Sequence, residues 1–78
     1  MRIHEGDIVN YKHQPRTLLA GQTGVCRINS FERSRNGMVV YIDQQLVDGS
    51  FFEKFSRHWP LEIAFAPLGS EQYGVYVG

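Results

Sequence analysis

Three histidines, one cysteine and scattered carboxylates are the side chains in this chain that could do metal, nucleophilic or acid–base chemistry. The sequence has neither His-x-x-x-His spacing nor paired cysteines among His4, His13 and His58, so no metal site is predicted. His4 together with Glu5 and Asp7 could meet at an ion if the fold converged there. The alternative is a solvated N-terminal segment.

The single cysteine and the acidic residues do not assemble a catalytic pattern. Cys26 has no partner for a disulfide within the chain and stands in an apolar stretch, which predicts a buried, inert thiol. No spacing places Asp43 with Asp48, or Glu53 with Glu62, as an acid–base pair. We therefore predict no catalytic, metal or cofactor-binding residue and no cofactor. An enzyme whose active site forms at an oligomer symmetry axis is the remote alternative.

Arginines and aromatic residues lie on and beside one predicted hairpin. Such a surface is typical of proteins that bind single-stranded nucleic acid. However, eight Lys and Arg balance eight Asp and Glu, and a neutral chain binds nucleic acid or anionic membranes weakly. A solvated hairpin end is the simpler interpretation. The possible nucleic-acid contacts are Arg27, Phe31, Arg33, Arg35 and Tyr41.

Ten aromatic rings are many for 78 residues, because one small core cannot enclose them all. Exposed rings commonly mark a contact with another protein or a second copy. We expect a self-associating module, a dimer or higher oligomer, that also binds a protein partner. The predicted contacts are Phe52, Trp59, Tyr73 and Tyr76.

These residues must be positioned by short strands separated by turns. The expected strands are residues 7–12, 25–32, 38–43, 61–66 and 72–77, each rich in β-branched or aromatic residues. Gly21 and Gly24 bracket a tight turn in which one or both take positive φ. Asn36-Gly37 predicts a type I′ hairpin turn.

The segment after the turn at residues 47–50 permits two interpretations. Ser50 and Glu53 match a helix capping box, which predicts a short helix from Phe51 to about His58. The aromatic content of the segment favours a strand instead. With a helix, the cluster of Phe51, Phe52, Phe55 and Trp59 either plugs the end of a barrel or contacts another subunit.

The opening of the chain resembles the KOW-type small barrels of translation and transcription factors. Those families show Gly-Asp-x-Val followed by Gly-x-x-Gly-x-Val; here Gly6, Asp7 and Val9 match the first part and Gly21 and Gly24 the second. Cys26 stands where valine is expected. The likeness covers roughly the first half of the chain and implies a mainly β fold, a small SH3-like barrel of about five strands with one short helix. It does not imply RNA or ribosome binding.

A second comparison is with the plasmid-encoded type II dihydrofolate reductases, which are similarly short SH3-like barrels that tetramerise. Their Val-Gln-Ile-Tyr run is absent, and the nearest stretch, residues 40–43, has another order, so that activity is not expected. Residues 1–78 are expected to form one domain, of a size common among small proteins of mobile genetic elements. With no apolar leader or spanning segment, the prediction is a cytoplasmic protein without membrane contact.

Overall fold

The computed structural model describes residues 1–15 and 17–76, apart from the side chains at positions 54 and 55. Its strands form a single antiparallel sheet in which the chain meanders and then returns to pair with its first strand. The predicted mainly β fold is confirmed. The strands are β1 (Ile8–His13), β2 (Thr23–Ser34), β3 (Gly37–Gln45), β4 (Phe51–His58) and β5 (Ile63–Pro67), in the order β4-β3-β2-β1-β5.

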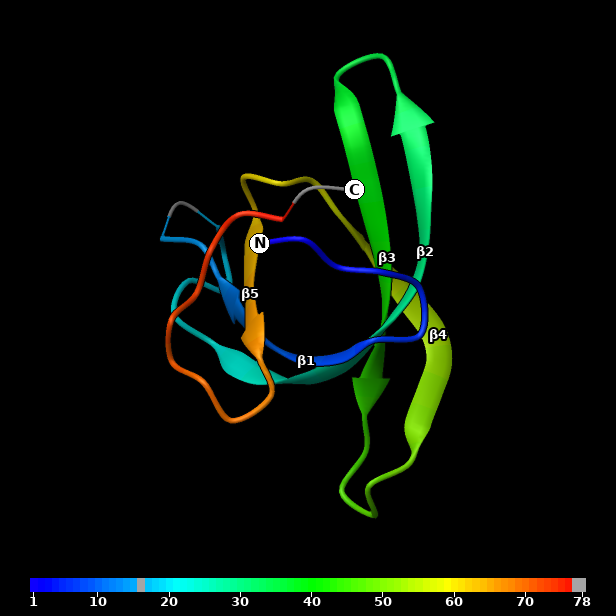
Figure 1. Cartoon of the computed structure of the whole chain (residues 1–78), viewed down its shortest axis with the longest axis vertical. Coiled ribbons are helices and arrows are strands. Elements are labelled where there is room, and N and C mark those ends of the chain that lie inside the picture. Colours follow the sequence, from blue (N-terminus) through cyan, green and yellow to red (C-terminus); the bar gives the residue numbers. More distant parts are fainter. Residues whose placement is uncertain (16, 77–78) are drawn as a thin grey trace.

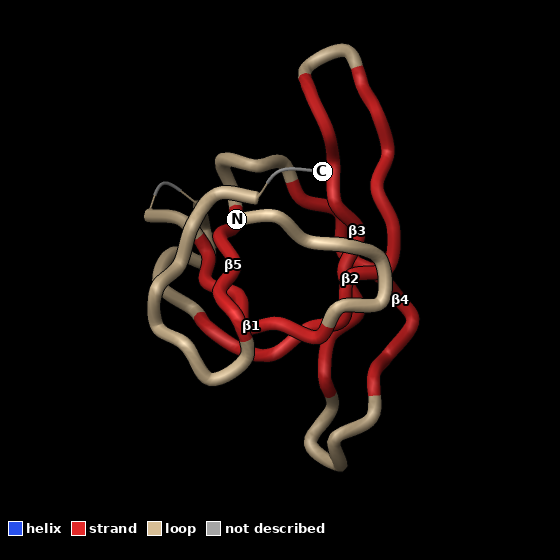
Figure 2. Tube along the Cα trace, in the orientation of Figure 1, coloured by secondary structure: helices blue, strands red, loops and turns tan. Residues whose placement is uncertain are grey.

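The sheet curls strongly, so that β1 and β5 lie across the interior from the β2–β3 hairpin (Figure 1). Its two edge strands, β4 and β5, do not pair within the described residues, and the sheet is therefore open. The β2–β3 and β3–β4 hairpins project in opposite directions beyond the curled body (Figure 2). These projections make the molecule elongated, with extents of 37 × 23 × 23 Å.

The core lies inside the curl and follows from the two-residue repeat of the strands. On β1 the buried side chains alternate as Val9, Tyr11 and His13. A register shift in β2 between Ile28 and Ser30 then changes which residues face inward. The apolar cluster consists of Ile3, Val9, Tyr11, Cys26, Ile28, Val40, Ile42, Ile63, Phe65 and Tyr76, with Met1 and Phe31 packed against it.

The β2–β3 hairpin is present, but its turn differs from the type I′ prediction. Ser34 pairs with Gly37, so Arg35 and Asn36 form the loop. Gly37 has a φ of 120°, and no described residue other than glycine has a positive φ. The prediction placed Asn36 in the left-handed region. The turn is shifted by one residue, because glycine alone takes up the unusual φ.

The predicted helix at 51–58 is wrong, and the strand interpretation is correct. Ser50 does not cap a helix, because its backbone N–H and its hydroxyl both donate to Asp48 Oδ1, at 3.0 and 2.6 Å. This turn directs the chain back along β3, where Gln44 pairs with Phe52. No described residue is helical, and thus no described helix could cross a membrane. The Phe55 side chain of the predicted aromatic cluster lies outside the described part.

The predicted last strand at 72–77 is reduced to one bridge. Gly74 exchanges two backbone hydrogen bonds with Phe65, at 2.9 and 3.0 Å. Residue 77 lies outside the described part. This contact covers the outer edge of β5 at its middle.

Candidate functional site

The strongest candidate site is a pocket at the end of the curled sheet where β1 and β4 finish. His13 is the last residue of β1 and continues the inward alternation, so only 7% of its surface is exposed. His58 is the last residue of β4 and lies opposite the buried Val40. The two imidazole rings meet with their centroids 5.4 Å apart, and Tyr11 supports His13 edge-on at 5.5 Å.

A tight turn after β4 adds a carboxylate to this histidine pair. The Glu62 N–H donates to the Trp59 carbonyl at 3.0 Å, and the Gln14 N–H donates to the Glu62 carbonyl at 2.9 Å. These bonds hold Glu62 Oε2 at 3.6 Å from His58 Nδ1. That distance is too long for a hydrogen bond.

His58 Nδ1 is therefore a buried nitrogen without a hydrogen-bond partner in the described structure. Burial lowers the pKa of His58 and the nearby His13 lowers it further, while Glu62 opposes both effects. The imidazole is consequently held neutral. Buried polar groups are seldom left unpaired, and each exception calls for an explanation.

Polar side chains and exposed leucines both line the pocket. Its volume is about 360 Å³, and Leu18 at its rim is fully exposed. The Thr17 hydroxyl donates to the Gln14 carbonyl at 2.9 Å, so its proton is already used in a hydrogen bond within the protein. The lining residues are His13, Thr17, Leu18, Leu19, His58 and Glu62.

This arrangement supplies proton acceptors rather than a metal cage. No three His, Cys, Asp or Glu side chains in the described residues are placed to hold a metal ion. A neutral imidazole beside a carboxylate can accept hydrogen bonds from a bound donor or exchange a proton with it. Sequence reasoning missed this site, although the alternation along residues 9–13 was a usable signal for the burial of His13.

The four residues predicted as partner contacts differ in exposure and in their surroundings. Phe52 is half exposed on β4, and Trp59 is half-buried beneath the Arg57 guanidinium, whose carbon lies 5.3 Å from the ring centroid. Tyr73 is half-buried, with Lys12 Nζ 5.7 Å from its ring.

Tyr76, by contrast, belongs to the core and is only 3% exposed. Its hydroxyl lies 2.9 Å from the carbonyl oxygens of both Met38 and His58 and shares its single proton between them. Its ring packs edge-on against Phe65, with the ring centroids 5.6 Å apart. Burial raises its pKa to about 12. Tyr76 therefore fastens the C-terminal segment to β3 and β4 rather than contacting a partner.

The residues predicted to contact nucleic acid are largely engaged with the protein itself. Tyr41 donates its hydroxyl to Glu32, and Phe31 packs against Tyr76 with ring centroids 6.3 Å apart. Two of the three predicted arginines, Arg33 and Arg35, form no ion pair in the described structure; they stand at the end of the β2–β3 hairpin beside a hollow of about 380 Å³.

Arg27, the fifth of these residues, is held by a buried carboxylate. Asp43 is fully buried, and Arg27 donates to its Oδ2 from Nε at 3.2 Å and from Nη2 at 3.1 Å. The Asn29 amide donates to both carboxylate oxygens at 3.3 Å, and Glu53 lies 3.6 Å from the same guanidinium. This network joins β2, β3 and β4, and it gives Arg27 a structural role.

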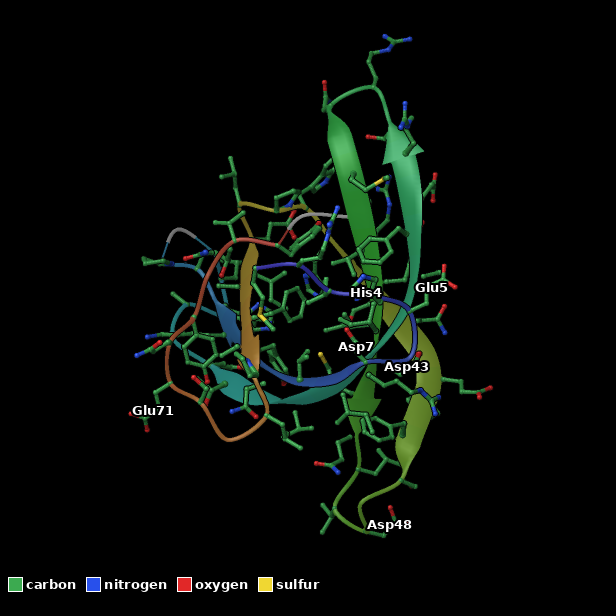
Figure 3. All side chains as sticks on the ribbon, viewed as in Figure 1. His4, Glu5, Asp7, Asp43, Asp48 and Glu71 are labelled. Atoms are coloured by element: carbon green, nitrogen blue, oxygen red, sulfur yellow. The ribbon has the colours of Figure 1, made fainter. Side chains whose placement is uncertain are left out.

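The other chemistry-bearing residues lie apart from the pocket. Cys26 is fully buried as predicted, and burial, followed by the charge of Asp43, raises its pKa to about 12. His4 and Asp7 form an exposed turn in which the His4 N–H donates to Asp7 Oδ2 at 2.8 Å. Figure 3 shows Asp48 at the projecting end of the β3–β4 hairpin, well separated from Asp43. The chain matches no protein-family model, no curated protein and no solved structure.

Proposed function

We propose that this protein is a small interaction module that self-associates through the end of its β3–β4 hairpin and binds a protein partner. The observation that carries the proposal is an apolar group on this projecting hairpin. Val47 is fully exposed, and Leu46 and Phe52 are about half exposed. Exposed apolar groups on a projection are a common site of protein contact.

A second copy is the favoured occupant because the hairpin end lacks charge complementarity for anything else. Between Leu46 and Phe52, Asp48 is the only charged residue. Its carboxylate already accepts two hydrogen bonds from Ser50. In a two-fold symmetric dimer, the apolar hairpin end of one copy contacts the same hairpin end of the other copy. The register shift between β3 and β4, with the exposed charges of Glu53 and Arg57, disfavours the alternative of pairing β4 edge to edge.

We further propose that the open, curled sheet is an SH3-like barrel that lacks closure between its edge strands. The return of β5 to pair with β1 supports this proposal. The single, buried cysteine fits a reducing, cytoplasmic setting.

Self-association is tested by measuring the mass in solution across a wide concentration range. We expect the wild-type mass to rise with concentration, and the double variant Val47→Ser, Phe52→Ser to stay monomeric with an unchanged circular dichroism spectrum. Leu68→Ser is the matched control, because Leu68 is similarly exposed but follows β5. A wild-type monomer at every concentration would remove the proposal.

Binding of single-stranded nucleic acid by the β2–β3 hairpin is the second candidate. It rests on the unpaired Arg33 and Arg35 at the end of a projecting ribbon. Two phosphate contacts predict that log K falls against log salt with a slope of about −1.4. Anisotropy titrations of labelled single-stranded RNA and DNA test this, with Arg33→Ala, Arg35→Ala as the variant and exposed Arg2→Ala as the control. An affinity for nucleic acid that changes neither with the salt concentration nor in the double variant would rule the candidate out.

A further inference from the structure

At the ends of β1 and β4, two acceptor atoms of the pocket lie close together without a hydrogen bond between them in the described structure. His58 Nδ1 is buried and unpaired, and Glu62 Oε2 lies 3.6 Å from it. Once the side chains that cover Nδ1 move aside, one nitrogen with several N–H groups can donate to both atoms at ordinary distances of about 2.7–3.2 Å. An ammonium group has three such donors and no acceptor.

The charge of the pocket favours a cation over an anion. Glu62 is the only acidic side chain among the described residues that line it, and no described lysine or arginine is among them. The histidine nearest to Glu62 is held neutral by burial. Among the described lining residues, nothing would compensate the negative charge that an incoming carboxylate or phosphate meets.

The rim of the pocket favours an apolar body behind the charged group. Leu18 and Leu19 present exposed aliphatic side chains on the loop between β1 and β2. A volume of about 360 Å³ is at the small end of ligand sites, which suits a short chain rather than a nucleotide. Covering the leucines would remove apolar surface from water.

We propose that this pocket binds a primary ammonium group carried on a short apolar chain, with Glu62 Oε2 and His58 Nδ1 as its acceptors and Leu18 and Leu19 against its carbon chain. The bound state requires the proton of His58 to be on Nε2, so that Nδ1 is free to accept. The site is separate from the β3–β4 hairpin end and does not depend on self-association. The ammonium group could belong to a lysine side chain of a partner protein or to a free aliphatic amine.

The test is a titration of the full chain with n-butylammonium, followed by NMR at about pH 8, where histidine is neutral and the amine is charged. We expect saturable shifts of the Leu18, Leu19 and His58 resonances, and imidazole nitrogen shifts that report the Nε2–H tautomer of His58. Butanol and butyrate carry the same chain without the positive charge. Both are expected to bind at least about tenfold more weakly.

Glu62→Gln is expected to weaken n-butylammonium binding about tenfold, since a charge-assisted bond is lost while the Glu62 backbone bonds remain. Glu71→Gln, an exposed carboxylate elsewhere, is the matched control. A lysine-containing tetrapeptide and its acetylated form then identify the source of the amine. Tighter binding of the free lysine peptide than of n-butylammonium indicates a protein partner, and the reverse indicates a small amine.

Three results would overturn the proposal. The first is equal affinity for n-butylammonium, butanol and butyrate, which would reduce the pocket to a nonspecific apolar surface. The second is shifts that do not saturate. The third is n-butylammonium binding that is unchanged in Glu62→Gln.

Discussion

Replacing Gly24 by alanine tests how closely β1 and β2 approach inside the curl. Gly24 pairs with Tyr11 across the sheet, and a Cβ atom at Gly24 would lie 2.7 Å from both Cε2 and Oη of the Tyr11 side chain. Cβ atoms in real structures do not make non-bonded contacts this short, so the Tyr11 side chain or the backbone must move. The ring is only 9% exposed and stands edge-on against His13, so it has little free space.

The expected cost follows from two opposing effects. Alanine in a strand is favoured over glycine by about 0.5–1 kcal/mol, because it loses less backbone entropy on folding. Overpacking a core position costs about 1–3 kcal/mol. We expect the clash to dominate and the free energy of unfolding to fall by about 1 kcal/mol, which lowers Tm by about 4–8 °C in a domain of this size.

The assay is urea unfolding followed by Trp59 fluorescence and circular dichroism, arranged as a double-mutant cycle with Tyr11→Leu. Without the ring, Gly24→Ala should become neutral or slightly stabilising, which gives a coupling of about 1 kcal/mol. Gly21→Ala is the matched control. Its φ is 81° with open space around it, so its cost should be the same with or without the Tyr11 ring. An equal cost of Gly24→Ala in both backgrounds would refute the reasoning.

Three further predictions use other parts of the fold. Asp43→Ala should lower the free energy of unfolding by about 2–4 kcal/mol, because it removes the buried acceptor of Arg27; a loss below about 1 kcal/mol in urea unfolding would contradict the network. Because the pKa of His58 is lowered from 6.5 in the folded state, the unfolded chain takes up its proton first, and stability should fall as the pH drops through 6.5 towards the folded pKa. His58→Gln should flatten this dependence in thermal melts at several pH values, whereas exposed His4→Gln should not. Gly37→Val should lower stability by about 1–3 kcal/mol, since a β-branched residue is strained at a φ of 120°, and an unchanged Tm would show that the turn is not as described.

Local sequence patterns predicted those parts of the fold that local physics determines. The β-branched run at 38–43 and the glycine at position 37 located the β2–β3 hairpin, because strand propensity and a required positive φ act over a few residues. The same logic placed Gly21 in a turn with positive φ. Gly24, however, is required by the Tyr11 ring, which a Cβ atom at position 24 would approach to 2.7 Å, and not by a positive φ of its own.

The failure at 51–58 shows how one side chain can serve two patterns. Ser50 followed by Glu53 satisfies a helix cap on paper, but Asp48 stands two residues before Ser50 and binds both its N–H and its hydroxyl. The resulting turn supplies β4 with a partner strand, and pairing with β3 then decides the conformation. Tertiary pairing outweighed a weak local preference.

The histidine pocket could not be predicted from spacing, because the strands that carry its two imidazoles are not neighbours in the sheet. β2 and β3 lie between β1 and β4 in the strand order, and only the curl brings His13 and His58 to a centroid distance of 5.4 Å. The curl in turn depends on core contacts such as that of Tyr76, whose hydroxyl holds the His58 carbonyl. A change that loosens Tyr76 should therefore separate the two imidazoles before it unfolds the sheet, so the pocket is a more sensitive reporter of the curl than the strands themselves.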